Sequence, residues 1–177
     1  MTNEPHIRFA ILEDLQGITD IYNHYVESSA ATFDIRPWKT EERIQWFEQF
    51  TEGSSHQCWV LVDEHKIFGY ACSTPFRPKP AYNTSVESTI YLDPSALGKG
   101  YGQQLYKHLF KELNKLQLNR CYGIVTLPNH ASVQLHESLG FETIGTLTEV
   151  GFKFSQYWDT VWMEKKLGTA QNSKQAL

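Results

Sequence analysis

The chain has 177 residues, of which 41% are hydrophobic and 14% aromatic, and a formal net charge of −4. This composition predicts one globular domain with a real core, and the acidic balance argues against nucleic-acid binding. No apolar run reaches membrane-spanning length, the first residues lack a signal-peptide pattern, and the three cysteines form no CxxC pair, so we expect a cytoplasmic protein that does not enter a membrane.

Strands and helices alternate along a predicted domain at residues 1–167, which precedes a polar tail at 168–177. Asp14 is expected to cap the first helix and Thr40 the second. The remaining pattern predicts strands at 6–11, 58–62, 67–73, 85–92, 121–127, 141–147 and 157–167, and helices after residue 102 and at 129–139. This order indicates a mixed α/β sheet rather than a helical bundle or a sandwich.

Three alternating glycines, Gly98, Gly100 and Gly102, lie between a predicted strand and a predicted helix. Glycine lets an anion approach main-chain N–H groups, and a helix N-terminus adds unpaired donors, so the pattern indicates a phosphate site. The spacing fits neither a Walker A loop nor the GxGxxG dinucleotide fingerprint. The plain alternative is a turn that is merely rich in glycine.

Glu87 lies within the predicted strand SVESTIYL, on the face opposite Val86 and Ser88. A carboxylate in a central strand is costly to bury unless it is paired or functional. It is therefore either a general base or one half of an ion pair with Arg77 or Lys153.

The segment SALGKGYGQQLY resembles the acetyl-CoA loop of the GCN5-related N-acetyltransferase (GNAT) superfamily, although Leu97 stands where that family has Gln or Arg. A narrower resemblance, from Arg8 to about Leu167, is to its phosphinothricin and methionine sulfoximine acetyltransferase branch. Five blocks carry it: IYNHYVESSAATFD, GYACSTPFRPKPAY, SVESTIYL, NHASVQLHESLGF and EVGFKFSQYWDTVWM. The resemblance implies a single-domain GNAT fold, with a mixed, mostly antiparallel sheet of about seven strands, about four helices, and two strands splayed apart at the coenzyme.

The resemblance also implies that acetyl-CoA is the co-substrate and that no metal takes part. Glu87 corresponds to the family's general base for direct attack by the amine, and His136 to the acid that protonates the leaving thiolate. The alternative for His136 is a packed helix residue. The expected coenzyme-binding residues are Ile90, Tyr91, Leu92, Gly98, Lys99, Gly100, Tyr101, Gly102, Gln103, Asn129 and Ser132.

The expected substrate residues are Phe33, Arg77, Tyr82 and Lys153. Arginine can bind a carboxylate through two parallel hydrogen bonds, which suits an amino-acid-like amine. The resemblance further implies a homodimer. Two other functions stay open: a GNAT enzyme acting on another amine, such as a peptide N-terminus or a polyamine, or a non-catalytic acyl-CoA sensor, which would not need Glu87.

Overall fold

A seven-stranded sheet in the order β1-β2-β3-β4-β5-β7-β6 forms the centre of the fold. The computed structural model describes residues 4–64 and 66–168, so residues 169–177 of the predicted tail lie outside the described part. Every neighbouring pair of strands is antiparallel except β4 and β5, which are parallel. The expected mixed, mostly antiparallel sheet is confirmed.

The elements follow the predicted order. The strands are β1 (His6–Phe9), β2 (Cys58–Val62), β3 (Ile67–Pro75), β4 (Ser85–Leu92), β5 (Arg120–Leu127), β6 (Glu142–Lys153) and β7 (Gln156–Lys166). The helices are α1 (Leu15–Ser28), α2 (Ile44–Phe47), α3 (Tyr101–Leu113) and α4 (His130–Ser138), and short 3-10 turns are η1 (Leu12–Asp14), η2 (Thr40–Arg43), η3 (Pro80–Tyr82) and η4 (Pro94–Ala96).

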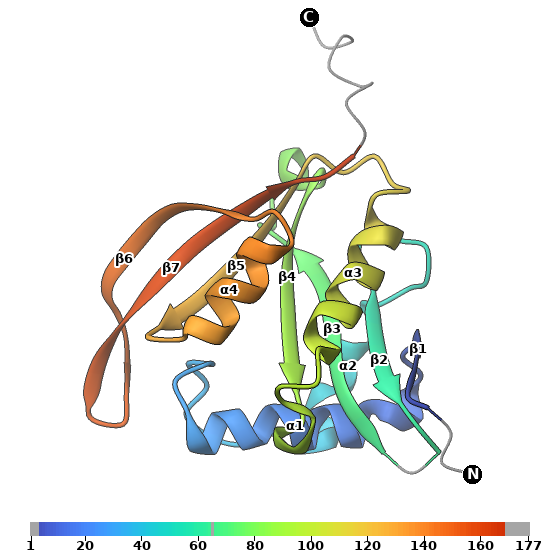
Figure 1. Cartoon of the computed structure of the whole chain (residues 1–177), viewed down its shortest axis with the longest axis horizontal. Coiled ribbons are helices and arrows are strands. Elements are labelled where there is room, and N and C mark those ends of the chain that lie inside the picture. The colour runs from blue at the N-terminus through green and yellow to red at the C-terminus, as the bar shows by residue number, and fades with distance from the viewer. Residues whose placement is uncertain (1–3, 65, 169–177) are drawn as a thin grey trace, which may run out of the picture.

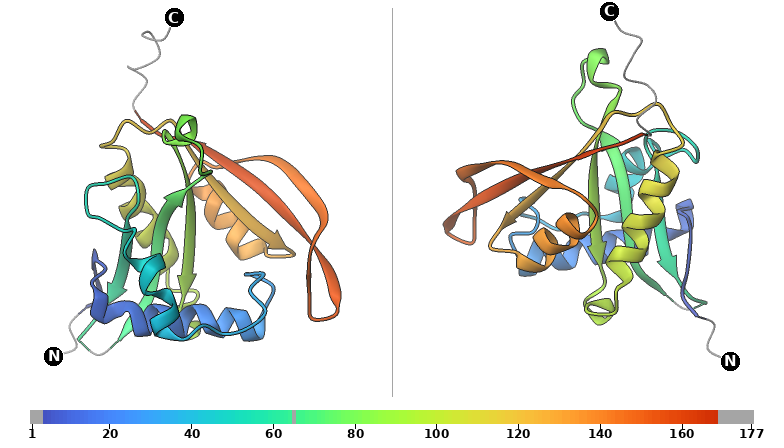
Figure 2. Two further views of the ribbon diagram at one scale, coloured as in Figure 1. Left: turned by 180° about the vertical axis from the view of Figure 1, so that it is seen from behind. Right: turned by 45° about the horizontal axis from the view of Figure 1, so that its top comes forward.

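Helices cover both faces of the sheet, α3 and α4 on one and α1 and α2 on the other (Figures 1 and 2). Strand β2 shows why two cores form. Its residues Trp59 and Leu61 pack with the α3 core, whereas Cys58, Val60 and Val62 pack with the α1 core. Because side chains alternate along a strand, an uninterrupted apolar run places one hydrophobic set on each face.

Strands β4 and β5 separate soon after they meet. Their pairing runs only from Ser85 opposite Arg120 to Glu87 opposite Tyr122. Beyond this point β4 stays paired with β3, while β5 follows β7 away from it (Figure 1). The expected splay of two central strands is therefore present, and it begins at Glu87.

Strand β6 is longer than its apolar pattern indicated, whereas β7 has the expected length and is shifted by one residue. They form one hairpin whose turn holds Phe154 and Ser155 at φ of 53° and 60°. The second predicted helix is shorter, with a 3-10 turn and a single α turn. Asp14 does not cap α1 with its side chain, because its carboxylate accepts hydrogen bonds from Arg8 and from Ile11 N.

Candidate active site

A run of free main-chain amides precedes and opens α3. Gly98 and Gly100 adopt φ of 74° and 76°, a region that glycine enters without steric cost, and Gly100 immediately precedes the helix. Within the described residues, the N–H groups from Gly98 to Gln103 donate no hydrogen bond to another protein group. Unpaired donors at a helix N-terminus can surround an anion such as a pyrophosphate. Gly102 has a different role, since an added Cβ would lie 3.2 Å from Leu135 of α4.

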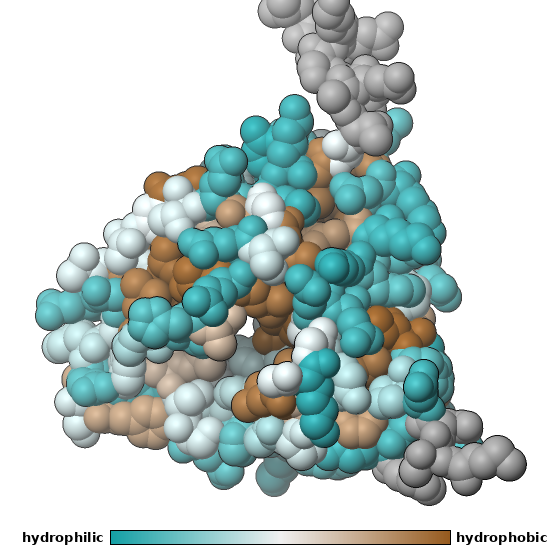
Figure 3. Space-filling model, in the orientation of Figure 1, coloured by the Kyte–Doolittle hydropathy of each residue, from teal (hydrophilic) through white to brown (hydrophobic). Residues whose placement is uncertain are grey.

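The separation of β4 and β5 opens into a cavity of about 540 Å³. Its wall includes β4 from Glu87 to Leu92, the start of the glycine loop, and α4 with the residue before it. Figure 3 shows this face hollowed between α4 and the segment that leads into α3, with apolar residues around the opening. The predicted coenzyme residues that line it are Ile90, Tyr91, Leu92, Gly98, Asn129 and Ser132. The cavity thus runs along β4 from Glu87 to the start of the glycine loop, where the free amides lie.

Asn129 and Tyr25 hold two parts of this cavity in place. Asn129 Oδ1 accepts a hydrogen bond from Ser132 N at 3.1 Å, which caps α4. The Tyr25 hydroxyl donates to Leu92 O at 2.6 Å, so α1 fixes the end of β4. Both residues line the cavity while they stabilise its wall.

Glu87 is half-buried at the point where the strands separate. Among the residues that the structure describes it forms no ion pair, so neither of the ion pairs considered for it exists. Burial raises the pKa of its carboxyl, and the charge of Arg77 partly opposes this rise. An unpaired carboxylate with a raised pKa beside a cavity can accept a proton from a substrate.

A second cavity, of about 400 Å³, lies on the α1 and α2 side of the sheet. Its wall is aromatic and charged, with Tyr22, Asp34, Trp38, Glu42, Arg43, Trp46, Tyr70 and Cys72. Glu87, Thr89 and Tyr91, which alternate along one face of β4, line both cavities. The two cavities therefore meet along β4, with the Glu87 carboxylate at the junction.

His136 is buried, with 3% of its surface exposed, and it lines the first cavity. Its Nδ1–H donates to Ser132 O at 2.8 Å, which leaves Nε2 as the acceptor for the Tyr106 hydroxyl at 3.3 Å. Burial lowers the pKa of the imidazole and favours this neutral form. Gly123 makes the position possible, because a Cβ there would lie 2.7 Å from His136 Nε2.

The predicted substrate residues do not come together. Phe33 lines the first cavity, with its ring against Gly151 of β6. Arg77 is exposed and lies over the rings of Phe76 and Trp162, at 4.5 and 5.5 Å. Tyr82, also exposed, packs edge-on against Phe76, and neither Arg77 nor Tyr82 lines the first or second cavity.

Lys153 has a structural connection to the site. Its side chain is 4% exposed, and Nζ donates to Ser29 O at 2.7 Å and to Thr32 O at 2.9 Å. These bonds attach β6 to the segment after α1, which carries Thr32 and Phe33 into the first cavity. The ammonium is thereby held away from the cavity interior, and burial lowers its pKa.

Sequence reasoning missed Tyr106, Gly123 and Arg43 as site residues. Tyr106 sits in the apolar stripe of α3, where a tyrosine is usually a core residue. Gly123 interrupts an apolar strand, which is a signal of close approach that could have been used. Arg43 was hidden in a polar helical pattern, and no local signal places it in a cavity.

Residues 18–141 match the acetyltransferase (GNAT) family, and the chain belongs to that family. It is an acetyl-CoA-dependent N-acetyltransferase of the GNAT type. The free amides and the opening between β4 and β5 fit such a coenzyme. In the described part of the chain, no cluster of three or more His, Cys, Asp or Glu could hold a metal, and no helix is long and apolar enough to cross a membrane.

Relatives are similar over nearly their whole length. A phosphinothricin N-acetyltransferase of Streptomyces coelicolor is 45% identical, covering 94% of this chain and 98% of the relative. An L-methionine sulfoximine/L-methionine sulfone acetyltransferase of Salmonella typhimurium is 32% identical, covering 91% and 94%. A phosphinothricin acetyltransferase of Sinorhizobium meliloti, solved in complex with AcCoA, superposes with a TM-score of 0.88 at 33% identity, covering 94% of this chain and 90% of that chain.

Proposed function

We propose that this protein acetylates the amino group of a small amino-acid-like substrate, such as phosphinothricin or methionine sulfoximine, by direct attack of the amine on the thioester. The placement of Glu87 carries the proposal. Its unpaired carboxylate stands where the coenzyme cavity meets the second, aromatic cavity. The names of the relatives support the substrate class.

In this proposal Glu87 takes a proton from the substrate ammonium, directly or through a water, because only a neutral amine has the lone pair for attack. Burial raises its pKa and so makes the carboxylate a stronger base. The amides of Gly98, Lys99, Gly100, Tyr101, Gly102 and Gln103 bind the pyrophosphate. Ile90, Tyr91, Leu92, Asn129 and Ser132 hold the rest of the coenzyme, and the Leu92 N–H polarises the thioester carbonyl.

We also propose that His136 supplies the proton that the departing thiolate needs. A neutral His136 accepts a hydrogen bond from Tyr106, so its acid form must reverse that bond. His136 first takes a proton from solvent, and its Nε2–H then donates to the Tyr106 oxygen. The hydroxyl passes its own proton to the sulfur while the Nε2 proton moves to the tyrosine oxygen, which restores neutral His136 and Tyr106. Phe33, Arg77, Tyr82 and Lys153 remain proposed contributors to substrate binding, through a closed arrangement or through a partner chain.

A homodimer is part of the proposal because the β6–β7 hairpin carries large exposed apolar side chains. They are Ile144, Leu147, Val150, Phe152, Phe154 and Tyr157, and each is at least 45% exposed. Exposed apolar side chains gathered on one element are typical of protein contacts. Size-exclusion chromatography with light scattering should give twice the 20.5 kDa chain mass, and a monomer at micromolar concentration would contradict the dimer. We assign the protein to the cytoplasm.

The test of the function is release of free CoA from acetyl-CoA with a panel of amines that includes phosphinothricin, methionine sulfoximine, a peptide and a polyamine. Glu87→Gln should lower kcat about 100-fold or more, since general-base catalysis contributes about 10²–10⁴-fold. The matched control is Glu142→Gln, an exposed glutamate on β6, which should leave kcat unchanged. Release with no amine would favour an acyl-CoA sensor, and release only with the peptide or polyamine would favour another acceptor.

A further inference from the structure

Arg43 places an unpaired cation in the wall of the second cavity. The residue ends η2 and is 6% exposed. Its guanidinium carbon lies 4.7 Å from the ring centroid of Tyr22 and 4.0 Å from that of Trp46. Nη1 is buried without a hydrogen-bond partner, and within residues 4–64 and 66–168 the guanidinium forms no ion pair.

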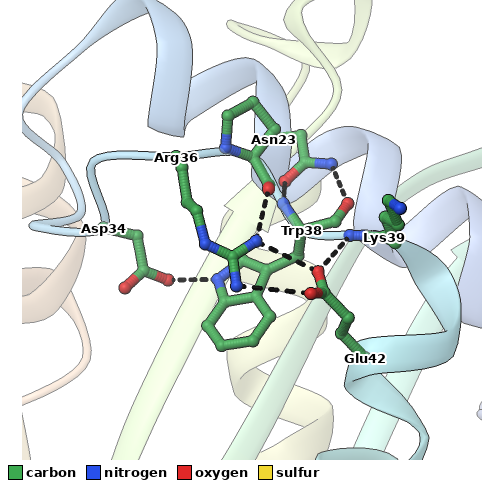
Figure 4. Close-up of polar contacts among 7 residues, drawn as sticks. Asn23, Asp34, Arg36, Trp38, Lys39 and Glu42 are labelled. Atoms are coloured by element: carbon green, nitrogen blue, oxygen red, sulfur yellow. Dashed lines mark hydrogen bonds and ion pairs between the residues drawn. The ribbon is translucent and has the colours of Figure 1, made fainter.

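The acidic side chains on the same wall are already bound to other groups. Asp34 Oδ2 accepts hydrogen bonds from the Tyr22 hydroxyl at 2.8 Å and from Trp38 Nε1 at 2.6 Å. Glu42 is paired with Arg36 at 3.2 Å and accepts from Lys39 N at 2.9 Å, as Figure 4 shows. Among the described residues neither carboxylate forms an ion pair with Arg43, so its guanidinium is open to a ligand.

The wall that carries these groups is held firmly. Asn23 of α1 accepts from Trp38 N at 2.9 Å and donates to Trp38 O at 2.8 Å, so both backbone groups of Trp38 are fixed (Figure 4). The side chain of Trp38 is fixed at the same time by Asp34. The segment from Asp34 to Arg43 is therefore a preorganised part of the cavity.

Arg43 and Glu87 both line the second cavity. The floor is formed by β3 and β4, where Cys72 stands opposite Thr89 and Thr74 opposite Glu87. Burial raises the pKa of the Cys72 thiol on this floor, the charge of Arg43 opposes the rise, and the charge of Glu87 adds to it. The cavity thus offers both a cation, Arg43, and a carboxylate, Glu87, and these two charges suit the carboxylate and the ammonium of a zwitterion.

We propose that Arg43 binds the carboxylate of the amine acceptor and is thereby the residue that selects an amino acid with a free carboxyl group over other amines. The inference rests on the proposed function, because it places the acceptor in the second cavity with its amine at Glu87. A planar guanidinium with buried N–H donors suits a carboxylate through two parallel hydrogen bonds. Arg77, the arginine that the sequence offered for this task, is exposed and lies outside the cavity.

Arg43→Met and Arg43→Lys test the inference with two probes, L-methionine sulfone and its carboxamide. Methionine fills a similar volume without the charge, and lysine keeps the charge without the planar fork. Arg120→Met is the matched control, since Arg120 lies on β5 outside both cavities. Binding of each probe is measured by calorimetry without acetyl-CoA, and turnover by release of free CoA.

We expect Arg43→Met to weaken binding of the sulfone about 10- to 100-fold, the range for a hydrogen-bonded charged group, and to change binding of the carboxamide little. Arg43→Lys should be intermediate, and Arg120→Met should match the wild type. The unfolding temperature of Arg43→Met should not fall, because the change removes a buried unpaired charge.

An equal loss of both probes, no loss of either, or a wild type that binds both probes equally would overturn the inference. These results are distinct from failure of the proposed function. A wild type that binds the sulfone through Arg43 but releases no CoA refutes acetylation and leaves the carboxylate site standing. The opposite result is a wild type that releases CoA while its Arg43→Met variant keeps the preference for the carboxylate. That result refutes the carboxylate site and leaves acetylation standing.

Discussion

The substitution Gly100→Ala tests whether coenzyme binding needs the left-handed backbone conformation at Gly100, without a change in side-chain packing. Gly100 has a φ of 76° and no atom within 4 Å of an added Cβ, so alanine meets no steric contact and the whole effect is conformational. A left-handed conformation costs an L-residue about 1–2 kcal/mol relative to glycine. In a chain of this size the unfolding temperature should fall by roughly 2–8 °C.

Two further glycines provide matched controls. Gly53 has a φ of 78° and equally open space but lies far along the chain from α3, whereas Gly145 has open space without a positive φ. Gly53→Ala should lower the unfolding temperature as much as Gly100→Ala and leave the affinity for acetyl-CoA unchanged. Gly145→Ala should change neither property.

The assays are thermal unfolding and calorimetric titration with acetyl-CoA. Only Gly100→Ala should lose coenzyme affinity, because relief of the strained φ reorients the amides on either side of it. We expect a loss of about 5- to 30-fold, which corresponds to 1–2 kcal/mol. An unchanged affinity in a destabilised Gly100→Ala protein would refute the view that these amides hold the pyrophosphate.

Further measurements test the rest of the site. Gly123→Ala should lower stability by about 1–3 kcal/mol in a chemical denaturation, because the new Cβ would press on His136, and a stable variant would disprove that close contact. Lys153→Met should lower stability by a similar amount because the carbonyl oxygens of Ser29 and Thr32 lose a charged donor. It should also raise the KM for the amine, because these two hydrogen bonds position the segment that carries Phe33. The value of kcat/KM should rise with pH through a pKa above the ordinary 4.3 of glutamate, since Glu87 acts as the deprotonated base, and an acidic limb that survives in Glu87→Gln belongs to another group.

The raised pKa of Glu87 also determines the direction in which this residue changes protein stability with pH. Its folded-state pKa is raised above the unfolded value, so the native state holds the proton more tightly than the unfolded state does. The contribution of Glu87 to the free energy of unfolding should therefore increase as the pH falls through the raised pKa. It should decrease as the pH rises through that pKa.

The periodic elements were predictable because their apolar patterns are local. The uninterrupted apolar run of β2, the alternation in β4 and the helical stripe of α3 place the core without any knowledge of distant contacts. The extension of β6 to Lys153 was not predictable in this way. Residues 148–153 enter the sheet through a register shift between Leu147 and Gly151, which depends on pairing with β7 rather than on their own pattern.

The same difference between local and distant information decides which residues of the candidate site could be predicted. Glu87 and the glycine loop could be found because a carboxylate in a strand and glycines before a helix are local anomalies. Arg43 and Tyr106 could not, because a basic residue in a polar turn and a tyrosine in an apolar stripe are ordinary until the sheet brings them to a cavity. The substrate role of Arg77 stays a prediction, because its side chain is exposed and lines neither the first nor the second cavity.

The early parting of β4 and β5 gives the sheet an edge in its own interior. Edge strands offer unpaired backbone groups to any strand-like ligand, and proteins usually protect such edges at the periphery. Here three residue pairs join two smaller sheets, β1 to β4 and β5 to β6. A ligand that pairs with this edge binds only the folded state, so the cellular level of coenzyme should contribute to the stability of the fold. Amide hydrogen exchange at Ile90 and Val125, on the two sides of the gap, should report how tightly the halves are joined.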